Sequence, residues 1–232
     1  MKFDGALYTV VIGDISGSKQ LSGENRYQTQ LFIKSALVQI NEQYQAEIEA
    51  PFTISKGDEF QVLLPTLEQA YKIILAFERL TFPIRVRFGI GVGTVLKMGG
   101  KLPIEMDGPA FHRANTALET AKKKKTCYTL NTGEEIRDSL VNTIFRLMSA
   151  IKSRWNERHH RLYWNYQSLG TYREVAASEK VTPQAICDVL KTMRAADIRE
   201  AERCLTENFR HFDSIFFHSR SPLEDEEIEK AR

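Results

Sequence analysis

Two aspartates follow strand-like segments and are of the residue type that binds metal ions. Asp14 comes after the apolar residues 7–12, and Asp58 lies between two short β-rich segments. Alone, an aspartate beside a glycine is commonly a turn residue, because its carboxylate accepts from backbone N–H groups. If the first strand lies beside the later hairpin, both carboxylates reach one edge of a sheet and repel each other unless a cation is present. The pair therefore predicts a divalent metal site, with Mg²⁺ as the natural ion and Mn²⁺ as the alternative.

A turn of small residues follows the first aspartate and leads into a helix. It consists of Ile15, Ser16, Gly17, Ser18 and Lys19. Backbone N–H groups of such a turn, together with the positive end of a helix, suit the phosphates of a nucleoside triphosphate. We expect the last four of these residues to contact phosphate. Lys122 is a further candidate, although a run of lysines at a helix end is most often a solvated cap.

Hydrophobic periodicity predicts a β-α-β-β-α-β order, with one extra helix and strand, in residues 1–133. Strand-like segments at 7–12, 52–55, 60–64, 85–95 and 127–130 alternate with helix-like segments at 24–47, 66–80 and 109–124. This order predicts an α+β domain with a ferredoxin-like, antiparallel sheet. Residues 134–220 carry no β signal and are expected to form a separate helical domain. The acidic residues 221–232 are expected to be disordered.

Residues 171–193 have the pattern of a helix-turn-helix. Thr182 is a suitable N-cap, and Pro183 occupies the first helical position, where proline is favoured. In this motif the second helix enters the major groove of DNA, where Pro183, Gln184 and Lys191 would face bases and phosphates. Asp188 on the same face would be repelled by phosphates. DNA binding is our expectation, with protein interaction or dimerisation as the alternative.

The composition is that of an ordinary globular protein. Of 232 residues, 42% are hydrophobic and 27% are charged, which excludes a chain too polar to fold. The net charge of +2 provides no overall basic field, so DNA binding would depend on a local surface. Three cysteines without paired spacing indicate reduced thiols. No apolar run is long enough for a membrane span, and without a secretory signal the expected location is the cytoplasm.

The two aspartate motifs resemble those of class III nucleotide cyclases. The first metal motif of these enzymes is similar to residues 13–18, and the second to residues 57–60, which also resemble the GDEF part of diguanylate cyclases. With residues 108–111 and the appended helix-turn-helix, nearly the whole chain is most similar to the SatD family, a group of bacterial proteins. The resemblance implies that Asp14, Asp58 and the Ile15 carbonyl bind the metal, and that the palm-like domain binds a nucleotide.

One part of the sequence departs from the cyclase pattern. Cyclases carry an asparagine and, four residues later, an arginine, and both act on the transition state. Counted from Gly108, these positions hold His112 and Thr116. The nearest substitutes, Arg113 and Asn115, are shifted onto other faces of the predicted helix.

Three hypotheses of function follow. The first is a regulator in which a palm-like domain that binds Mg²⁺ and nucleotide controls the attached DNA-binding module. The second is an enzyme, a two-metal nucleotide cyclase or nucleotidyltransferase, for which a homodimer with the palms face to face is expected. The third is a structural or protein-interaction module that has lost its ligand. We expect the first.

Overall fold

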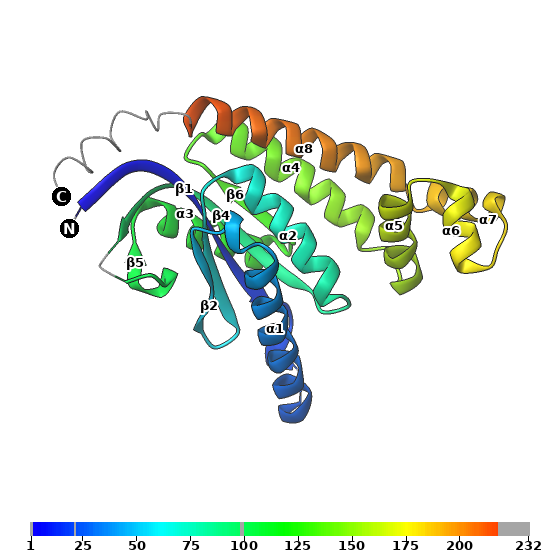
Figure 1. Cartoon of the computed structure of the whole chain (residues 1–232), viewed down its shortest axis with the longest axis horizontal. Coiled ribbons are helices and arrows are strands. Elements are labelled where there is room, and N and C mark those ends of the chain that lie inside the picture. The colour runs from blue at the N-terminus through cyan, green and yellow to red at the C-terminus, as the bar shows by residue number, and fades with distance from the viewer. Residues whose placement is uncertain (1, 21, 98–99, 218–232) are drawn as a thin grey trace.

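A six-stranded, mostly antiparallel sheet lies at the centre of the fold. The computed structural model describes residues 2–20, 22–97 and 100–217 (Figure 1). Its strands are β1 (Lys2–Ile15), β2 (Ala50–Lys56), β3 (Glu59–Leu64), β4 (Val86–Lys97), β5 (Met106–Asp107) and β6 (Tyr128–Asn131). The strands lie in the order β2-β3-β1-β4-β5, and β6 pairs in parallel with β4. The first strand is therefore central, with the β2–β3 hairpin on one side and β4 on the other.

Helices cover both faces of this sheet (Figure 1). They are α1 (Gly23–Gln43), α2 (Leu67–Thr81), α3 (Pro109–Lys124), α4 (Glu135–Lys152), α5 (Glu157–Leu169), α6 (Tyr172–Glu179), α7 (Pro183–Thr192) and α8 (Ala195–Phe216), with short 3₁₀ turns at Ser18–Gln20, Gln45–Glu47 and Pro103–Glu105. Alternate residues of β1 point to opposite faces. Val10 belongs to a buried cluster shared with α3, whereas Val11 belongs to a second, larger cluster under α1, α2 and α4.

Helix α3 lies unusually close to β4 because the strand presents glycines to it. A Cβ atom at Gly89 would be 2.3 Å from the Ala114 carbonyl oxygen, and one at Gly91 would be 2.2 Å from the Ala114 nitrogen. Both distances are too short for any side chain. Glycines alternate with larger residues along this strand. Because they carry no side chain, the backbone of α3 packs directly against the backbone of β4.

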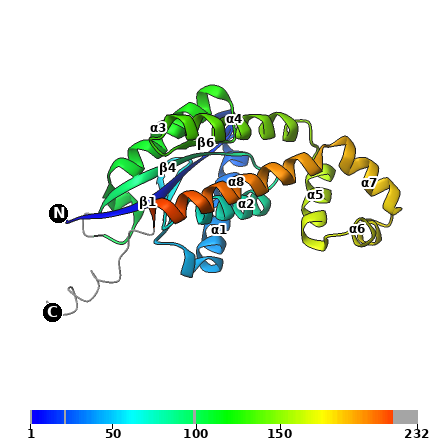
Figure 2. The same ribbon diagram turned by 90° about the horizontal axis from the view of Figure 1, so that it is seen from above.

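The C-terminal helices share a core with the sheet. One cluster of buried residues continues from Ile90 of β4 to Phe209 of α8, and α8 lies beside α2 and α4 (Figure 2). The Asp213 carboxylate accepts hydrogen bonds from the backbone N–H groups of Leu67 and Glu68, at 2.9 and 2.8 Å, and so caps α2. A separate C-terminal domain is therefore not shown in the described part of the chain.

The mixed α/β fold and the predicted β-α-β-β-α-β order are confirmed. The predicted helix at residues 109–124 coincides with α3. Thr66 caps α2 by accepting from the Gln69 N–H. The sequence did not predict α5 or the two-residue β5. Among the described residues, no helix is both long and apolar enough to span a membrane. The acidic residues 221–232 lie outside the described part of the structure.

Candidate functional site

Strand pairing brings the two aspartates to the same end of the sheet. Asp14 lies opposite Glu59 of β3 on one side and opposite Arg87 of β4 on the other. Asp58 occupies the two-residue turn between β2 and β3, directly after Gly57, whose φ of +60° is a conformation that glycine adopts without strain. The hairpin geometry therefore places Asp58 one residue beyond the partner of Asp14. We call Asp14, Asp58 and Glu59, with the cations beside them, the acidic edge.

Asp58 is the most enclosed carboxylate of the acidic edge, with its side chain 7% exposed. Arg26 of α1 forms an ion pair with it at 3.1 Å, and Gln30, one helical turn later, donates a second hydrogen bond. The Ser18 hydroxyl donates a third. Burial raises the pKa of Asp58, but the bonds from Ser18, Gln30 and Arg26 outweigh burial and lower it, so the carboxylate is ionised at neutral pH.

Asp14 is less well compensated. Its ion pair is with Arg87, at 3.8 Å, which is longer than a hydrogen bond. Burial raises the pKa of Asp14, and the charges of Glu59 and Asp58 add to that effect, whereas Lys122 and Arg87 oppose it. The net result is a raised pKa. Asp14 is thus a carboxylate among other carboxylates, in an environment that favours the approach of an additional cation.

Lys122 reaches the acidic edge from the last turn of α3. Its Nζ atom lies 2.8 Å from Glu59 and 3.0 Å from Glu119. Burial alone would lower the pKa of Lys122, but the hydrogen bonds to Glu59 and Glu119 and the charge of Asp14 raise it. Each of the three acids therefore has a cation beside it: Arg87 pairs with Asp14, Arg26 with Asp58, and Lys122 with Glu59.

The turn after Asp14 is only partly free to hold phosphate. The Ser16 N–H donates to the Arg85 carbonyl at 2.8 Å, and the Ser18 hydroxyl is used by Asp58. Gly17 is exposed at φ +76°, and Ile15 is buried and paired with Val86. The side chain of Lys19 lies outside the described part of the structure. Gly17 is thus the exposed residue of this turn that phosphate can reach, since Ser18 is buried and the Gln20 N–H donates to the Gly17 carbonyl.

The acidic edge fits a metal ion that arrives with a nucleotide. Among the described residues, no three His, Cys, Asp or Glu side chains form a group that could hold a metal. Mg²⁺ needs only one or two protein carboxylates when waters and phosphate oxygens complete its shell. Asp14 and Asp58 supply two, and Asp58 has to release Arg26 or Gln30 to take part. The donor set thus suits a shared metal–phosphate site and does not suit a permanent all-protein site.

Comparison with known proteins gives the family. The sequence profile of the SatD family matches residues 8–196. The chain belongs to the SatD family. The match extends from β1 of this SatD family member to the start of α8, so it includes the acidic edge and helices α4 to α7. The comparison with curated proteins gave no match.

Among solved structures, this SatD family member is similar to nucleotide cyclases. A bacterial light-regulated adenylyl cyclase has 17% identity, with 56% of this chain and 44% of that chain covered and a TM-score of 0.42. The adenylyl cyclase CyaB from P. aeruginosa has 20% identity, with 52% and 73% covered and a TM-score of 0.36. A regulator of polyketide synthase expression from Bifidobacterium adolescentis has 11% identity, with 88% and 86% covered and a TM-score of 0.24.

The residues of α3 at or beside the positions of the cyclase asparagine and arginine have partners within this SatD family member. His112 is exposed and forms an ion pair with Asp107 at 3.4 Å when it is protonated. Arg113 donates to the Val92 carbonyl at 2.6 Å, and Asn115 donates to the Phe111 carbonyl at 3.1 Å. The side chains of Arg113 and Asn115 are thus both bonded to backbone carbonyl groups. Thr116 likewise donates to a backbone carbonyl, that of His112, at 2.9 Å.

The predicted DNA-contacting residues lie apart from the acidic edge. Helices α6 and α7 form the end of the molecule beyond α5 (Figure 1). In α7 the side chains of Ile186 and Leu190 are buried, whereas Pro183, Gln184 and Lys191 are exposed. Gln184 donates to Asp188 at 2.9 Å. The structure brings Asp14, Asp58, Ser18 and Lys122 together, but it does not bring α7 to them.

Three residues that contact the aspartates of the acidic edge were missed at the level of sequence. Arg26 and Gln30 are four residues apart on α1, and this spacing places them on one helix face, as their joint contact with Asp58 shows. Nothing in the sequence says which strand that face approaches. Arg87 depends on the β1–β4 register, which is a long-range property. A search for hydrogen-bond donors at helical spacing after Asp14 would have found the first two.

Proposed function

We propose that the acidic edge binds the phosphates of a nucleoside triphosphate together with Mg²⁺ or Mn²⁺. The observation that carries the proposal is the position of Asp14. Its carboxylate lies next to those of Asp58 and Glu59, and its ion pair with Arg87, at 3.8 Å, compensates it only partly. A divalent cation supplies the missing positive charge, and the surrounding Arg and Lys side chains supply charge for the phosphates.

Each residue of the acidic edge has a role in this proposal. Asp14 and Asp58 hold the metal, which neutralises phosphate charge when bound. Arg26 and Lys122 turn from their carboxylate partners toward phosphate oxygens, and Gly17 offers backbone close to the phosphates. Because Arg113 and Asn115 are bonded to backbone, binding without turnover is favoured over cyclisation. We therefore propose a nucleotide-responsive regulator, with a nucleotide cyclase or nucleotidyltransferase as the alternative.

The first prediction concerns the metal dependence of nucleotide binding. Calorimetric titration with ATP and GTP is expected to show binding that requires Mg²⁺. Asp14→Asn and Asp58→Asn are each expected to weaken it at least about tenfold, which corresponds to about 1.4 kcal/mol. Asp107→Asn is the matched control, because it makes the same change at an exposed position outside the acidic edge.

Two further measurements on the same samples separate the alternatives. Chromatography of the incubated nucleotides for a cyclic or linked product, with light scattering for a homodimer, identifies an enzyme if both are found. Lack of binding at millimolar nucleotide, or binding that Asp14→Asn leaves unchanged, contradicts the proposed site.

DNA binding by α7 is a second candidate function, favoured by the exposure of Pro183, Gln184 and Lys191 on one helix. We predict that Lys191→Ala weakens binding to a random-sequence duplex and lowers the slope of log K against log salt by about one, because one phosphate contact is lost. Lys34→Ala, on the exposed side of α1, is the control. Fluorescence anisotropy over a salt series measures both slopes. Equal slopes for the two variants contradict a role of α7 in DNA binding.

A further inference from the structure

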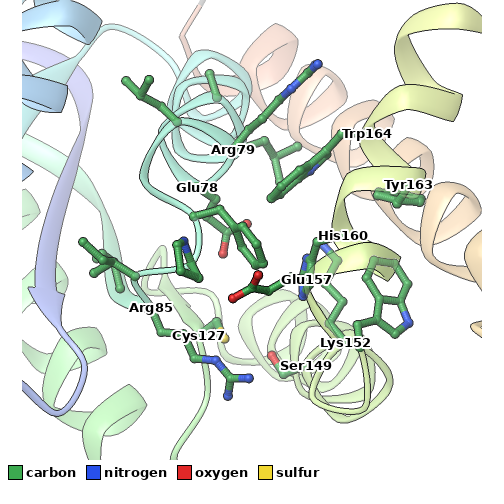
Figure 3. Close-up of a pocket in the computed structure, with 18 of the residues that line it drawn as sticks. Glu78, Arg79, Arg85, Cys127, Ser149, Lys152, Glu157, His160, Tyr163 and Trp164 are labelled. Carbon is green, nitrogen blue, oxygen red and sulfur yellow. The ribbon is translucent and has the colours of Figure 1, made fainter. Parts of the chain in front are cut away.

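A cavity of about 1020 Å³ lies between the sheet and the C-terminal helices (Figure 3). Its walls come from the end of α2, the connection to β4, the corner between α4 and α5, and α8. None of the residues of the acidic edge lines it. A volume of this size holds a drug-sized molecule. The cavity is thus a second place where a ligand fits, and it is separate from the proposed nucleotide site.

Aromatic rings form one side of the cavity. The ring of Phe82 lies 4.7 Å from that of His160 and 5.1 Å from that of Trp164, and His160 lies 5.2 Å from Trp155. Burial, followed by the charges of Lys152 and Arg85, lowers the pKa of His160 to about 4, so its imidazole is neutral at physiological pH. An uncharged group of flat rings is a surface on which a planar ligand stacks.

Glu78 is the acidic group that faces this aromatic side from deep in the cavity. Figure 3 shows the carboxylates of Glu78 and Glu157 directed inward. Among the described residues Glu78 has no ion pair, because the nearest buried cation, Lys152, is bonded to Glu202 at 2.9 Å. The Oγ atom of Ser149, also on the lining, is buried with no hydrogen-bond partner in the described part of the chain. Burial raises the pKa of Glu78, although the charge of Lys152 and a hydrogen bond with Tyr128 oppose this effect. A further hydrogen-bond donor on a ligand would lower the cost of burying the carboxylate.

We propose that this cavity binds a small planar aromatic or heteroaromatic molecule that carries an amidine or a similar cationic N–H group. The group donates to Glu78, and the ring lies against Phe82, His160 and Trp164. Of the cations on the lining, Arg79, Arg85 and Lys125 are exposed, and the mostly buried Lys152 is already paired with Glu202. An anionic ligand deep in the cavity would therefore meet the carboxylate of Glu78 and is disfavoured. The proposal stands on the cavity itself and does not depend on nucleotide binding.

The cavity adjoins the segment that positions the acidic edge. The side chain of Arg85 lines the cavity, while its backbone carbonyl accepts the hydrogen bond from Ser16 in the turn after Asp14. Two residues later in the same segment, Arg87 forms the ion pair with Asp14. An occupant therefore contacts the segment that positions the acidic edge, as well as α5 and α8 of the C-terminal helices.

Benzamidine, benzamide and benzoate are the probes that test this proposal on the full chain. They share one ring and differ in carrying a cationic, a neutral or an anionic group. The two tryptophans of the chain, Trp155 and Trp164, both line the cavity, so intrinsic fluorescence reports occupancy directly. Benzamidine is expected to give a saturable change with an affinity at least about tenfold higher than that of benzamide. Benzoate is expected to give none.

Glu78→Gln is the variant that tests the carboxylate, since it keeps the size of the side chain. It is expected to remove the preference for benzamidine over benzamide, whereas Glu24→Gln, on α1 and outside the cavity, retains it. The three-probe comparison on the unmodified protein decides the question even if Glu78→Gln does not fold. Three outcomes overturn the proposal: no saturable binding of benzamidine up to about 10 mM, a concentration at which even a very weak site fills; binding of benzoate as tight as that of benzamidine; or a folded Glu78→Gln protein with unchanged preference.

Discussion

Replacement of Lys152 by methionine is expected to destabilise the protein by about 3–5 kcal/mol, the usual cost of removing one partner of a buried ion pair. The Nζ atom of Lys152 lies 2.9 Å from Glu202, and the two side chains are 19% and 10% exposed. Burial opposes the charge on Lys152, but the carboxylates of Glu202 and Glu78 outweigh burial and raise its pKa. The lysine therefore stays charged. Methionine fills the same space but leaves Glu202 in the core without its cation.

Urea denaturation measures this loss in the free energy of unfolding. Two further variants serve as controls. In Lys152→Met/Glu202→Gln both charges are absent, and we expect most of the stability to return, because Tyr163 and Gln167 still have an amide oxygen to bond. Lys72→Met breaks the exposed pair with Glu47, also a short contact at 2.8 Å, and is expected to cost less than about 1 kcal/mol. Equal losses for Lys152→Met and Lys72→Met would show that burial of the pair does not matter.

Gly91→Ala is the second substitution with a large expected effect, about 3 kcal/mol, the upper part of the range for overpacked cores. The new Cβ would lie 2.2 Å from the Ala114 nitrogen and 2.3 Å from the Ala110 oxygen. Both atoms are backbone and cannot rotate away, so α3 has to move off the sheet. Lys122 lies on this helix, and its contact with Glu59 at the acidic edge is expected to be lost as α3 moves.

The control for this substitution is Gly23→Ala at the start of α1, where a Cβ would meet nothing within 4 Å. There the change is expected to be neutral or to stabilise by about 0.4–1 kcal/mol, because alanine restricts the unfolded chain. Thermal unfolding followed by circular dichroism compares the two variants. If Gly91→Ala unfolds at the same temperature as the unmodified protein, α3 does not rest on β4 as closely as described.

The fold was predictable from the sequence wherever local signals agree. Helix α3 begins at Pro109 and ends in lysines, which are favoured at those two ends, and its bounds match the prediction. Helix α5 was missed because its buried stripe is narrow: Leu162 and Tyr163 are its buried residues, and most of its other positions are polar. Helix α8 falls within the segment expected to be helical, but it packs on α2 and α4 of the same chain, which the sequence did not indicate.

Of the residues at the candidate site, the sequence predicted the aspartates Asp14 and Asp58 but not the arginines that compensate their charge. The approach of Asp14 and Asp58 follows from pairing β1 with the β2–β3 hairpin, and it could be expected once the strands were placed. The cations that compensate the acids depend on strand register and on the direction of α1, and neither property is local in sequence. The cavity at Glu78 was not expected at all, because its walls are residues that lie far apart along the chain.

The cap on α2 has a consequence for biosynthesis. The N–H groups of Leu67 and Glu68 precede their acceptor, Asp213, by 146 and 145 positions. At about 5–20 residues per second, the first turn of α2 is made many seconds before its cap. The ring of Tyr71 packs 5.3 Å from that of Phe209, so Tyr71 also stays uncovered until α8 has been made. During this interval the apolar face of α2 that α8 later covers is exposed, and a chaperone can bind there.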